Sequence, residues 1–527
     1  MAHPFYWEHP MRRLLLGIAG LALAFAAGAQ NLVLGTKLEL NTLDPHFFSA
    51  FPTNSAMEYF FDKLVQYDQD LRIEPQLAES WKLIDDRTWE FHLRRGVRFH
   101  DGTPFTADDV IFTVERIPNV PNSPNSFAQF TRGIESMRKV DDATLIVKTK
   151  APYPQLLSDF ANIFIVSARA AKGATTADFN SGKAVVGTGP YRLVEWVNGE
   201  RLVVQRNDAY WGPRPAWARV TERVIAKDPT RLAALLAGQV DAIDAVPIPD
   251  LERLKREGRF ALFHGPAALV HYVALDSARD VSPFVTAKDG KPLASNPLRD
   301  RRVRKALSLA INREAIVQRI MEGSAAAAGQ MLSGQFPSAS HSLKPDPYDP
   351  AKALALLRDA GWGEGFRIVL HATSDRYPND AAVAQAIAQM WSRIGLKAEV
   401  EVLPGSVFFT RASKQEFSAF AAQYGAEDSI NSLRALVATA DPARGYGTAN
   451  RTRYSNPKVD ELLTQALTAM DDADRQRKLE GAIDVAMADQ PLIPVFFPIH
   501  EFAAKKDLVV TPRAQRRFNG LMVAPKR

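Results

Sequence analysis

The stretch from residue 366 to residue 403 constrains the fold of this chain more than any other. Residues 366–371 form a short apolar run typical of a buried strand, and residues 396–403 form another. Between them, apolar side chains recur at the spacing of one helix face. These apolar positions are Val383, Ile387, Met390, Trp391 and Ile394. The pattern predicts a βαβ unit, whose two strands should be parallel.

Strand-like and helix-like segments alternate along the rest of the chain as well. Trp89, Phe91 and Leu93 alternate with polar residues, as on a half-buried strand. Thr106 precedes a helix-like segment and Asp109 follows three positions later, which resembles a capping box. The alternation predicts an α/β fold. A chain of 527 residues is long enough for about three domains or two large lobes.

The N-terminal 29 residues have the composition of an export signal. Arg12 and Arg13 carry positive charge, residues 14–27 are apolar or small, and residues 27–29 have the small-x-small form that signal peptidase accepts. The apolar stretch is shorter than the roughly 20 residues that a membrane-spanning helix needs. We expect cleavage after Ala29, with a retained anchor as the alternative. Because the chain has no cysteine, disulfides and a lipid anchor on an N-terminal cysteine are excluded.

No catalytic, cofactor or metal-binding motif is visible in the sequence. Gly187-Thr188-Gly189 lacks the third glycine of a dinucleotide-binding fingerprint, and no serine lies in a Gly-x-Ser-x-Gly elbow. The ten histidines are scattered, without the spacing of metal ligands. We therefore expect no cofactor, no metal site and no enzymatic activity. Because catalytic groups can be far apart in sequence, a periplasmic hydrolase or chaperone stays open as an alternative.

The formal net charge of +6 is small for a chain of this length. The densest basic stretch, residues 299–305, overlaps a helix-like segment with an apolar stripe through Val303 and Leu307. We interpret its basic residues as the solvated face of that helix, opposite the stripe, and we expect no nucleic-acid partner.

Several segments of the chain resemble one known family. Residues 89–110 read WEFHLRRGVRFHDGTPFTADDV, residues 303–317 read VRKALSLAINREAIV, and residues 348–362 read YDPAKALALLRDAGW. In this order and spacing they resemble the bacterial extracellular solute-binding family 5, the dipeptide-, oligopeptide- and nickel-binding proteins of ABC importers. The resemblance covers nearly all of the chain after residue 29. Shorter matching segments are residues 77–81, 186–191, 207–212 and 454–460.

The resemblance implies an α/β fold of two lobes, the Venus-flytrap fold of periplasmic binding proteins, with an extra subdomain in the first lobe. Hinge strands are expected near residues 270–275 and 493–498. The expected boundaries are residues 30–270 with 490–527 for the first lobe, about 53–170 for its extra subdomain, and 271–489 for the second lobe.

The resemblance also implies a function in binding and transport. A small peptide or peptide-like solute would bind between the lobes, which would close over it. The permease subunits of an ABC importer in the inner membrane would then receive it from this soluble, periplasmic and monomeric protein. Other solutes stay open as alternatives: an opine, an oligosaccharide, haem or a nickel chelate. Bare nickel is disfavoured because no histidine cluster is present.

Arg376 and Tyr377 are the first candidate ligand-binding residues. They lie in the loop that follows the strand at residues 366–371 and precedes a helix. Ligands of open α/β sheets bind beyond the carboxyl ends of the strands, and a carboxylate there would gain a charge-assisted bond from Arg376 and free N–H groups of the helix N-terminus. Dipeptide-binding members of the family place an arginine in a similar loop, against the carboxylate of the ligand. An exposed loop arginine is the alternative.

Asp428 and its neighbour Glu427 are the second pair of candidates. They lie in the loop 425–431, which follows another strand-like run. In dipeptide-binding relatives an aspartate in this region pairs with the α-amino group of the ligand. Here the Asp-Pro-Asp-like stretch of the family is replaced by Gly-Ala-Glu-Asp-Ser-Ile-Asn, a departure from the dipeptide-binding pattern that keeps other ligand classes open. A solvated acid or a helix cap is the alternative for Asp428.

Weaker candidates lie in two glycine-containing segments. The backbone at Gly187, Thr188 and Gly189 forms a tight turn that could approach the ligand or could only shape the lobe. Tyr446 and Asn450, in the glycine-containing loop before Tyr454, could line the space between the lobes.

Overall fold

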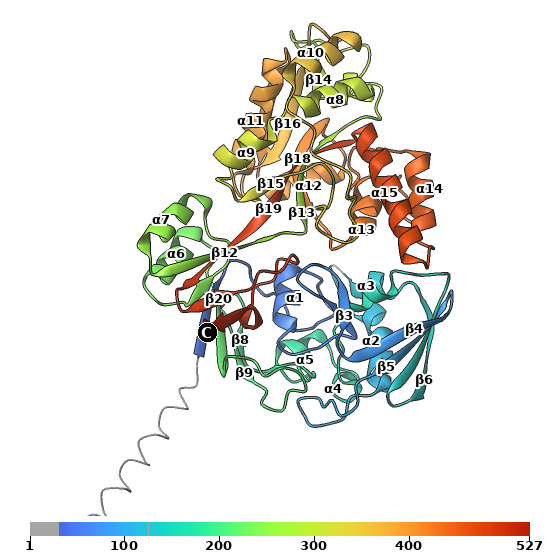
Figure 1. Ribbon diagram of the computed structural model, residues 1–527, viewed down its shortest axis with the longest axis vertical. Coiled ribbons are helices and arrows are strands. Elements are labelled where there is room, and N and C mark those ends of the chain that lie inside the picture. Colours follow the sequence, from blue (N-terminus) through green and yellow to red (C-terminus); the bar gives the residue numbers. More distant parts are fainter. Residues whose placement is uncertain (1–30, 125, 527) are drawn as a thin grey trace, which may run out of the picture.

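A computed structural model describes residues 31–124 and 126–526 of the chain. The predicted export signal, residues 1–29, lies outside the described residues. Figure 1 shows two bodies, an upper one and a lower one, with a few long strands running between them. Every helix within the described ranges is too short or too polar to span a bilayer.

The first lobe is built on one half of a large mixed sheet. Its strands are β1 (Asn31–Thr36), β8 (Tyr191–Val197), β9 (Arg201–Arg206), β10 (Arg219–Val224) and β11 (Ala242–Ile243). β1 pairs in parallel with β10 on one side and with β11 on the other. The hairpin of β8 and β9 extends the sheet beyond β10. The surrounding helices are α1 (Phe51–Met57), α4 (Ala168–Ala171), α5 (Thr176–Asn180), α6 (Asp228–Leu236) and α7 (Leu251–Glu257).

A separate four-stranded antiparallel sheet forms the extra subdomain of the first lobe. Its elements are β4 (Ala78–Asp85), β5 (Thr88–Leu93), β6 (Ile134–Asp141), β7 (Thr144–Thr149), α2 (Ala107–Arg116) and α3 (Leu156–Phe160). The predicted alternation on β5 is confirmed, because Trp89, Phe91 and Leu93 are buried between half-exposed neighbours. The predicted capping box is confirmed as well, since the Asp109 carboxylate accepts the backbone N–H of Thr106 at 2.9 Å.

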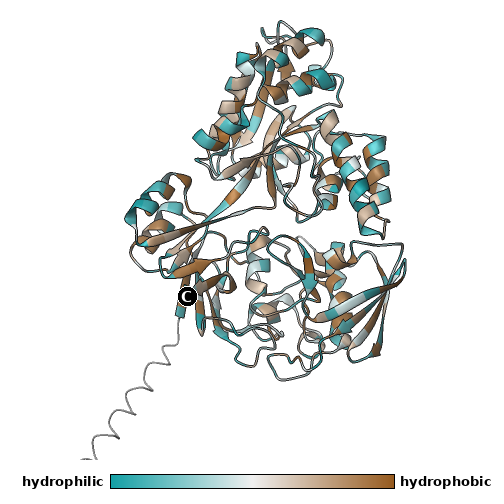
Figure 2. Ribbon diagram, in the orientation of Figure 1, coloured by the Kyte–Doolittle hydropathy of each residue, from teal (hydrophilic) through white to brown (hydrophobic). Residues whose placement is uncertain are grey.

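The second lobe contains the predicted βαβ unit. Its strands are β13 (Leu269–Leu275), β14 (Val285–Thr286), β16 (Arg367–Thr373), β17 (Lys397–Leu403) and β18 (Ala419–Gly425). β16 and β17 are parallel, as predicted, and α11 connects them. In Figure 2 the apolar, brown positions concentrate on the strands, while the helices carry teal positions as well. The helices are α8 (Arg301–Leu309), α9 (Arg313–Arg319), α10 (Pro350–Asp359), α11 (Asp380–Arg393), α12 (Gly405–Ser413), α13 (Ser429–Leu436), α14 (Pro457–Ala466) and α15 (Asp472–Asp489).

The prediction that the basic residues at 299–305 face solvent is wrong for Arg304. Only 5% of Arg304 is exposed. Its guanidinium donates to the carbonyl oxygen of Leu298 at 2.8 Å and to that of Asp489 at 2.6 Å. Because carbonyl groups at the C-terminal end of a helix attract a cation, Arg304 joins α8 to the end of α15 instead of pointing into water.

One long strand, β19 (Leu492–Lys505), passes through both lobes. Its first half pairs with β13 and with β15 (Ala325–Ala327), and its second half pairs with β12 (Phe260–Pro266) and β11. In Figure 1 it is the red strand that slants from the upper body to the lower one. The strands named above as hinge candidates pair with each other within the second lobe. The chain therefore passes between the sheet halves just beyond them, at residues 266–269 and 498–499.

The two lobes are in contact in this structure. The side chains of Leu332, Phe336 and Ala339, from the second half of the chain, belong to the same buried apolar cluster as the core of the extra subdomain. Gln155 of the first lobe also donates a hydrogen bond to Asp428 of the second lobe at 3.4 Å. Groups between the lobes are therefore buried. Burial disfavours the charged form of a titratable group and shifts its pKa accordingly.

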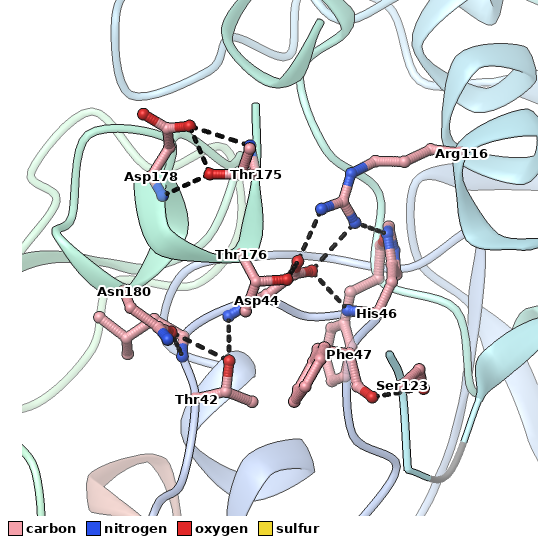
Figure 3. Close-up of polar contacts among 12 residues, drawn as sticks. Thr42, Asp44, His46, Phe47, Arg116, Ser123, Thr175, Thr176, Asp178 and Asn180 are labelled. Atoms are coloured by element: carbon pink, nitrogen blue, oxygen red, sulfur yellow. Dashed lines mark hydrogen bonds and ion pairs between the residues drawn. The ribbon is translucent and has the colours of Figure 1, made fainter. Parts of the chain in front are cut away.

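A buried ion pair fixes the segment after β1 against the extra subdomain (Figure 3). The Arg116 guanidinium donates to both carboxylate oxygens of Asp44, at 2.9 and 2.7 Å, and to the Nδ1 atom of His46 at 2.8 Å. The hydroxyl of Thr176 donates to the same carboxylate at 2.9 Å. Burial lowers the pKa of His46 to about 4, so the ring stays neutral and its Nε2 atom donates to the carbonyl oxygen of Phe164.

Candidate functional site

The loop after β16 holds Arg376 at the carboxyl end of the second-lobe sheet. The Asp380 carboxylate, in the first turn of α11, accepts the backbone N–H groups of Arg376 at 3.3 Å and Tyr377 at 3.2 Å, and the hydroxyl of Thr373 at 2.5 Å. These bonds fix the loop. The use of free N–H groups at the N-terminus of α11 by a ligand carboxylate stays a prediction, because Arg376 and Tyr377 precede that helix.

The Arg376 side chain itself is free to meet a ligand. It is exposed, and its guanidinium has no hydrogen bond or ion pair with the described residues; it lies 5.9 Å from the ring centroid of Tyr377. The Tyr377 hydroxyl donates to the carbonyl oxygen of Gln423 at a long 3.5 Å. Arg376 is thus a cation without a hydrogen-bond or ion-pair partner among the described residues.

Arg516 belongs to the first lobe, and its charge interacts with the charge of Arg376 in the second lobe. Its backbone has a φ of 58°, and its guanidinium lies 4.7 Å from the ring centroid of Phe51. Burial lowers the pKa of Arg516 to about 10, and the positive charge of Arg376 lowers it further. The charges of Arg376 and Arg516, one from each lobe, thus act on each other, while Tyr377 and Asp244 act on the pKa of Arg516 in the opposite direction.

A cavity of about 50 Å³ lies beside Arg516 in the first lobe. Three parallel strands end at its wall, because Thr36 closes β1, Val224 closes β10 and Asp244 follows β11. Ligands of α/β sheets bind at such strand ends. The walls also carry three aromatic side chains, Phe51, Trp196 and Phe518.

Asp428 acts as the N-cap of α13, which was the alternative to a ligand-binding role. One of its carboxylate oxygens accepts the backbone N–H of Asn431 at 2.7 Å, the usual bond of a cap. The other accepts the side-chain amides of Asn431 at 3.1 Å and of Gln155 at 3.4 Å. Burial raises the pKa of Asp428. Its oxygens are thus largely engaged within the protein.

Glu427 has a carboxylate that no other described residue hydrogen-bonds. Burial raises its pKa, and the negative charge of Asp428 raises it further, while Lys63 of the first lobe acts in the opposite direction. Burial lowers the pKa of Lys63 to about 7, and the charge of Arg513 adds to this effect. Of the two neighbouring acids, Glu427 is the one with unused acceptor capacity.

The segment Gly187-Thr188-Gly189 packs against the chain itself. A Cβ atom added at Gly187 would lie 1.9 Å from the carbonyl oxygen of Phe60, and one added at Gly189 would lie 2.5 Å from the carbonyl carbon of Phe60. The Thr188 hydroxyl donates to the buried carboxylate of Asp62 at 2.8 Å. These contacts explain both glycines by close packing of two backbone segments.

Tyr446 and Asn450 are buried in the second lobe. The Asn450 amide donates to the carbonyl oxygens of Ala438 and Tyr454, and its oxygen accepts the N–H of Tyr454. The side-chain amide of Asn450 is therefore hydrogen-bonded to backbone groups of its own lobe through both its nitrogen and its oxygen. The Tyr446 ring is 9% exposed, and the guanidinium groups of Arg434 and Arg444 lie 5.4 and 4.2 Å from its centroid.

Sequence reasoning missed the basic segment near the C-terminus. Arg517 forms an ion pair with Glu58, and Arg513 lies 3.6 Å from the same carboxylate. Arg516, between them, has no such partner among the residues that the structure covers. Three arginines within five residues, in a segment already assigned to the first lobe, were the available signal.

Comparison with known proteins identifies the family. The model of "Bacterial extracellular solute-binding proteins, family 5 Middle" matches residues 72–442. The glutathione-binding protein GsiB of Shigella flexneri is 29% identical over 501 residues, covering 91% of each chain.

Solved structures show the same two-lobed fold. The periplasmic binding protein DppA of Helicobacter pylori, in complex with the peptide STSA, superposes with a TM-score of 0.74 at 24% identity, covering 94% of this chain and 98% of that one. HbpA2 of Haemophilus parasuis superposes with a TM-score of 0.80 at 22% identity, covering 94% and 100%. The chain belongs to the bacterial extracellular solute-binding proteins of family 5.

Proposed function

We propose that this protein binds a small peptide or peptide-like zwitterion between its lobes and delivers it to the permease of an ABC importer. The observation that carries the proposal is the pairing of β16 with β18, which are parallel neighbours in the second-lobe sheet. Because the carboxyl ends of parallel neighbours meet at one edge of a sheet, the loops that hold Arg376 and Glu427 lie side by side. One loop offers an unpaired cation and the other an unbonded carboxylate.

These two groups match the two charged ends of a peptide. A ligand carboxylate would pair with Arg376 through charge-assisted hydrogen bonds, and a ligand ammonium group would pair with Glu427. Each charge that is buried on closure needs a partner, since an unpaired buried charge costs several kcal/mol. The names of similar proteins agree with this ligand class, because GsiB is called glutathione-binding and the DppA structure contains a peptide.

The wider proposal includes the lobe boundaries and the export route. The lobes would comprise residues 30–270 with 490–527 and residues 271–489, and they would close by bending where β12 leads into β13 and within β19. The mature protein would begin after Ala29 and act in the periplasm as a monomer. Its role would be binding and release, without chemistry on the solute.

Native mass spectrometry of the protein purified from the periplasm tests this function. We expect a small molecule that leaves on denaturation and whose fragmentation shows peptide bonds or γ-glutamyl linkages. A sugar, haem or metal chelate in its place would support the other solutes and contradict a peptide-like ligand. Turnover of a peptide panel by the same preparation would contradict a purely binding role.

A further inference from the structure

Three buried hydrogen-bond donors in the second lobe have no acceptor among the residues that the structure describes. They are the hydroxyl of Tyr272, the Nε atom of Arg434 and the Nε atom of Arg451. Within the described chain, neither guanidinium makes a hydrogen bond or an ion pair. A buried donor without a partner costs about 1–3 kcal/mol, so three donors in one region indicate a partner that the chain does not supply.

The three side chains belong to one side of the second-lobe sheet. In the pairing of β13 with β18, Tyr272 lies opposite Ala422 and Val270 lies opposite Tyr424, so the two tyrosines share a face. This face packs against the apolar cluster under α13 and α15. The guanidinium of Arg434 lies 5.4 Å from the ring of Tyr446, and that of Arg451 lies 5.5 Å from the ring of Phe409. Both rings pack in this same cluster.

Tyr424 connects the two arginines with the loop of Glu427. Burial raises the pKa of Tyr424 to about 12, and the charges of Asp428 and Glu427 raise it further. The charges of Arg434 and Arg451 act in the opposite direction. Both guanidinium groups therefore lie within electrostatic reach of a phenol that is close to the candidate ligand-binding loop.

The two carboxyl groups whose pKa values Arg434 lowers, Asp428 and Asp159, are already engaged. The Asp428 carboxylate accepts the backbone N–H of Asn431, and the Asp159 carboxylate accepts the hydroxyl of Tyr153 at 2.6 Å. Arg434 lowers the pKa of both acids, yet it forms no ion pair with either within 4.0 Å in the part of the chain that the structure describes. Its charge is therefore not paired by direct contact.

We propose that Tyr272, Arg434 and Arg451 form a second anion-binding subsite, which takes an acidic side group of the ligand. The subsite rests on the proposed function, because it lies beside the loop of Glu427. Two guanidinium groups and a phenol supply the donors that a carboxylate accepts. With Arg376 for one carboxylate and this subsite for another, the preferred ligand is a peptide with at least two carboxylates and one ammonium group.

Calorimetric titration with two isosteric peptides tests the subsite. The probes are Ala-Glu-Ala and Ala-Gln-Ala, which differ by one charge, and the proteins are the wild type, Arg451→Met and Arg434→Met. We expect the wild type to bind the glutamate peptide at least tenfold more tightly. Each substitution should weaken binding of the glutamate peptide at least tenfold and change binding of the glutamine peptide less than threefold.

Arg444→Met is the matched control. Arg444 lies over the same Tyr446 ring as Arg434, but it is exposed and donates to the Tyr446 hydroxyl at 3.1 Å. Its substitution should leave the preference for the glutamate peptide unchanged. Equal binding of both peptides by the wild type, or equal losses for both in the variants, would overturn the subsite and leave the proposed function standing. Binding of neither peptide by the wild type would contradict both.

Discussion

Arg376 of the second lobe and Arg516 of the first lobe carry like charges that act on each other across the lobe interface. Neither guanidinium has an ion-pair partner in the part of the chain that the structure describes. Like charges brought together disfavour closure of the empty protein, and an anion between them reverses the effect. We therefore expect the pair to link closure of the lobes to the presence of a negatively charged ligand group.

Arg376→Ala should weaken binding of a peptide with a free carboxylate more than tenfold. The substitution removes a charge-assisted hydrogen bond to the ligand and no bond within the protein, so the thermal unfolding midpoint of the empty protein should change little. Calorimetry and a thermal scan measure the two effects. Arg393→Ala, at the exposed end of α11, is the control. Unchanged affinity in Arg376→Ala would remove this residue from the site.

Arg516→Met should make the empty protein more compact. The methionine keeps most of the side-chain length but removes the charge that repels Arg376, so closed molecules should form a larger share of the empty population. Small-angle X-ray scattering should give a smaller radius of gyration for the variant than for the wild type without ligand, and the same radius with ligand. Identical radii without ligand would contradict a repulsive role for Arg516.

We expect Glu427 to act in ligand binding and Asp428 to act in the stability of the fold. Glu427→Gln removes the negative charge that would pair with a ligand ammonium group, and we expect affinity to fall more than tenfold. Asp428→Ala removes the N-cap of α13, which should lower the free energy of unfolding by about 1 kcal/mol. Calorimetry and denaturant unfolding distinguish the two. The opposite pattern, with binding lost only in Asp428→Ala, would show that Asp428 and not Glu427 binds the ligand ammonium group.

The sequence-based prediction was accurate where local patterns determine structure. The apolar spacing at residues 383–394 is a property of one helix, and the parallel strands on either side follow from it. The export signal at residues 1–29 lies outside the described residues and stays a prediction. The solvated face predicted at residues 299–305 was wrong for Arg304, because its partners are carbonyl groups at the end of α15, almost 200 positions away.

The candidate site was harder to predict, since its residues meet across long sequence distances. The position of Arg376 followed from the strand before it, but no local pattern pairs it with Arg516. The roles of Gly187 and Gly189 could not be read from spacing either. Two glycines near each other indicate a close approach of the backbone, and only the fold shows that the approaching group is Phe60.

The stability of the empty protein should fall in mild acid partly because of His271. Only 1% of His271 is exposed, neither of its ring nitrogens has a hydrogen-bond partner among the described residues, and the ring stacks on Phe496 at 4.6 Å between centroids. Burial lowers the pKa of His271 from its ordinary value of 6.5 to about 3. Between these two values the unfolded chain binds more protons than the folded one, so stability rises with pH there and is lost as pH falls.

A His271→Phe variant isolates this contribution. The phenyl ring keeps the stacking and cannot take up a proton, so the variant should lose stability less steeply than the wild type between pH 6.5 and pH 3. The slope of unfolding free energy against pH should differ between wild type and variant by up to about 1.4 kcal/mol per pH unit. Denaturant unfolding over this range measures it, with the difference at pH 7.5 as the baseline. Parallel stability curves would show that His271 accepts a proton without unfolding.

The most direct test of a zwitterion held between the lobes is calorimetric titration with one tripeptide in two forms, with free ends and with an acetylated N-terminus and an amidated C-terminus. Both forms present the same side chain and the same backbone between the ends. If Arg376 and Glu427 pair with the charged ends, the free form should bind at least 100-fold more tightly than the blocked form. Equal binding of the two forms would contradict the site proposed for this protein.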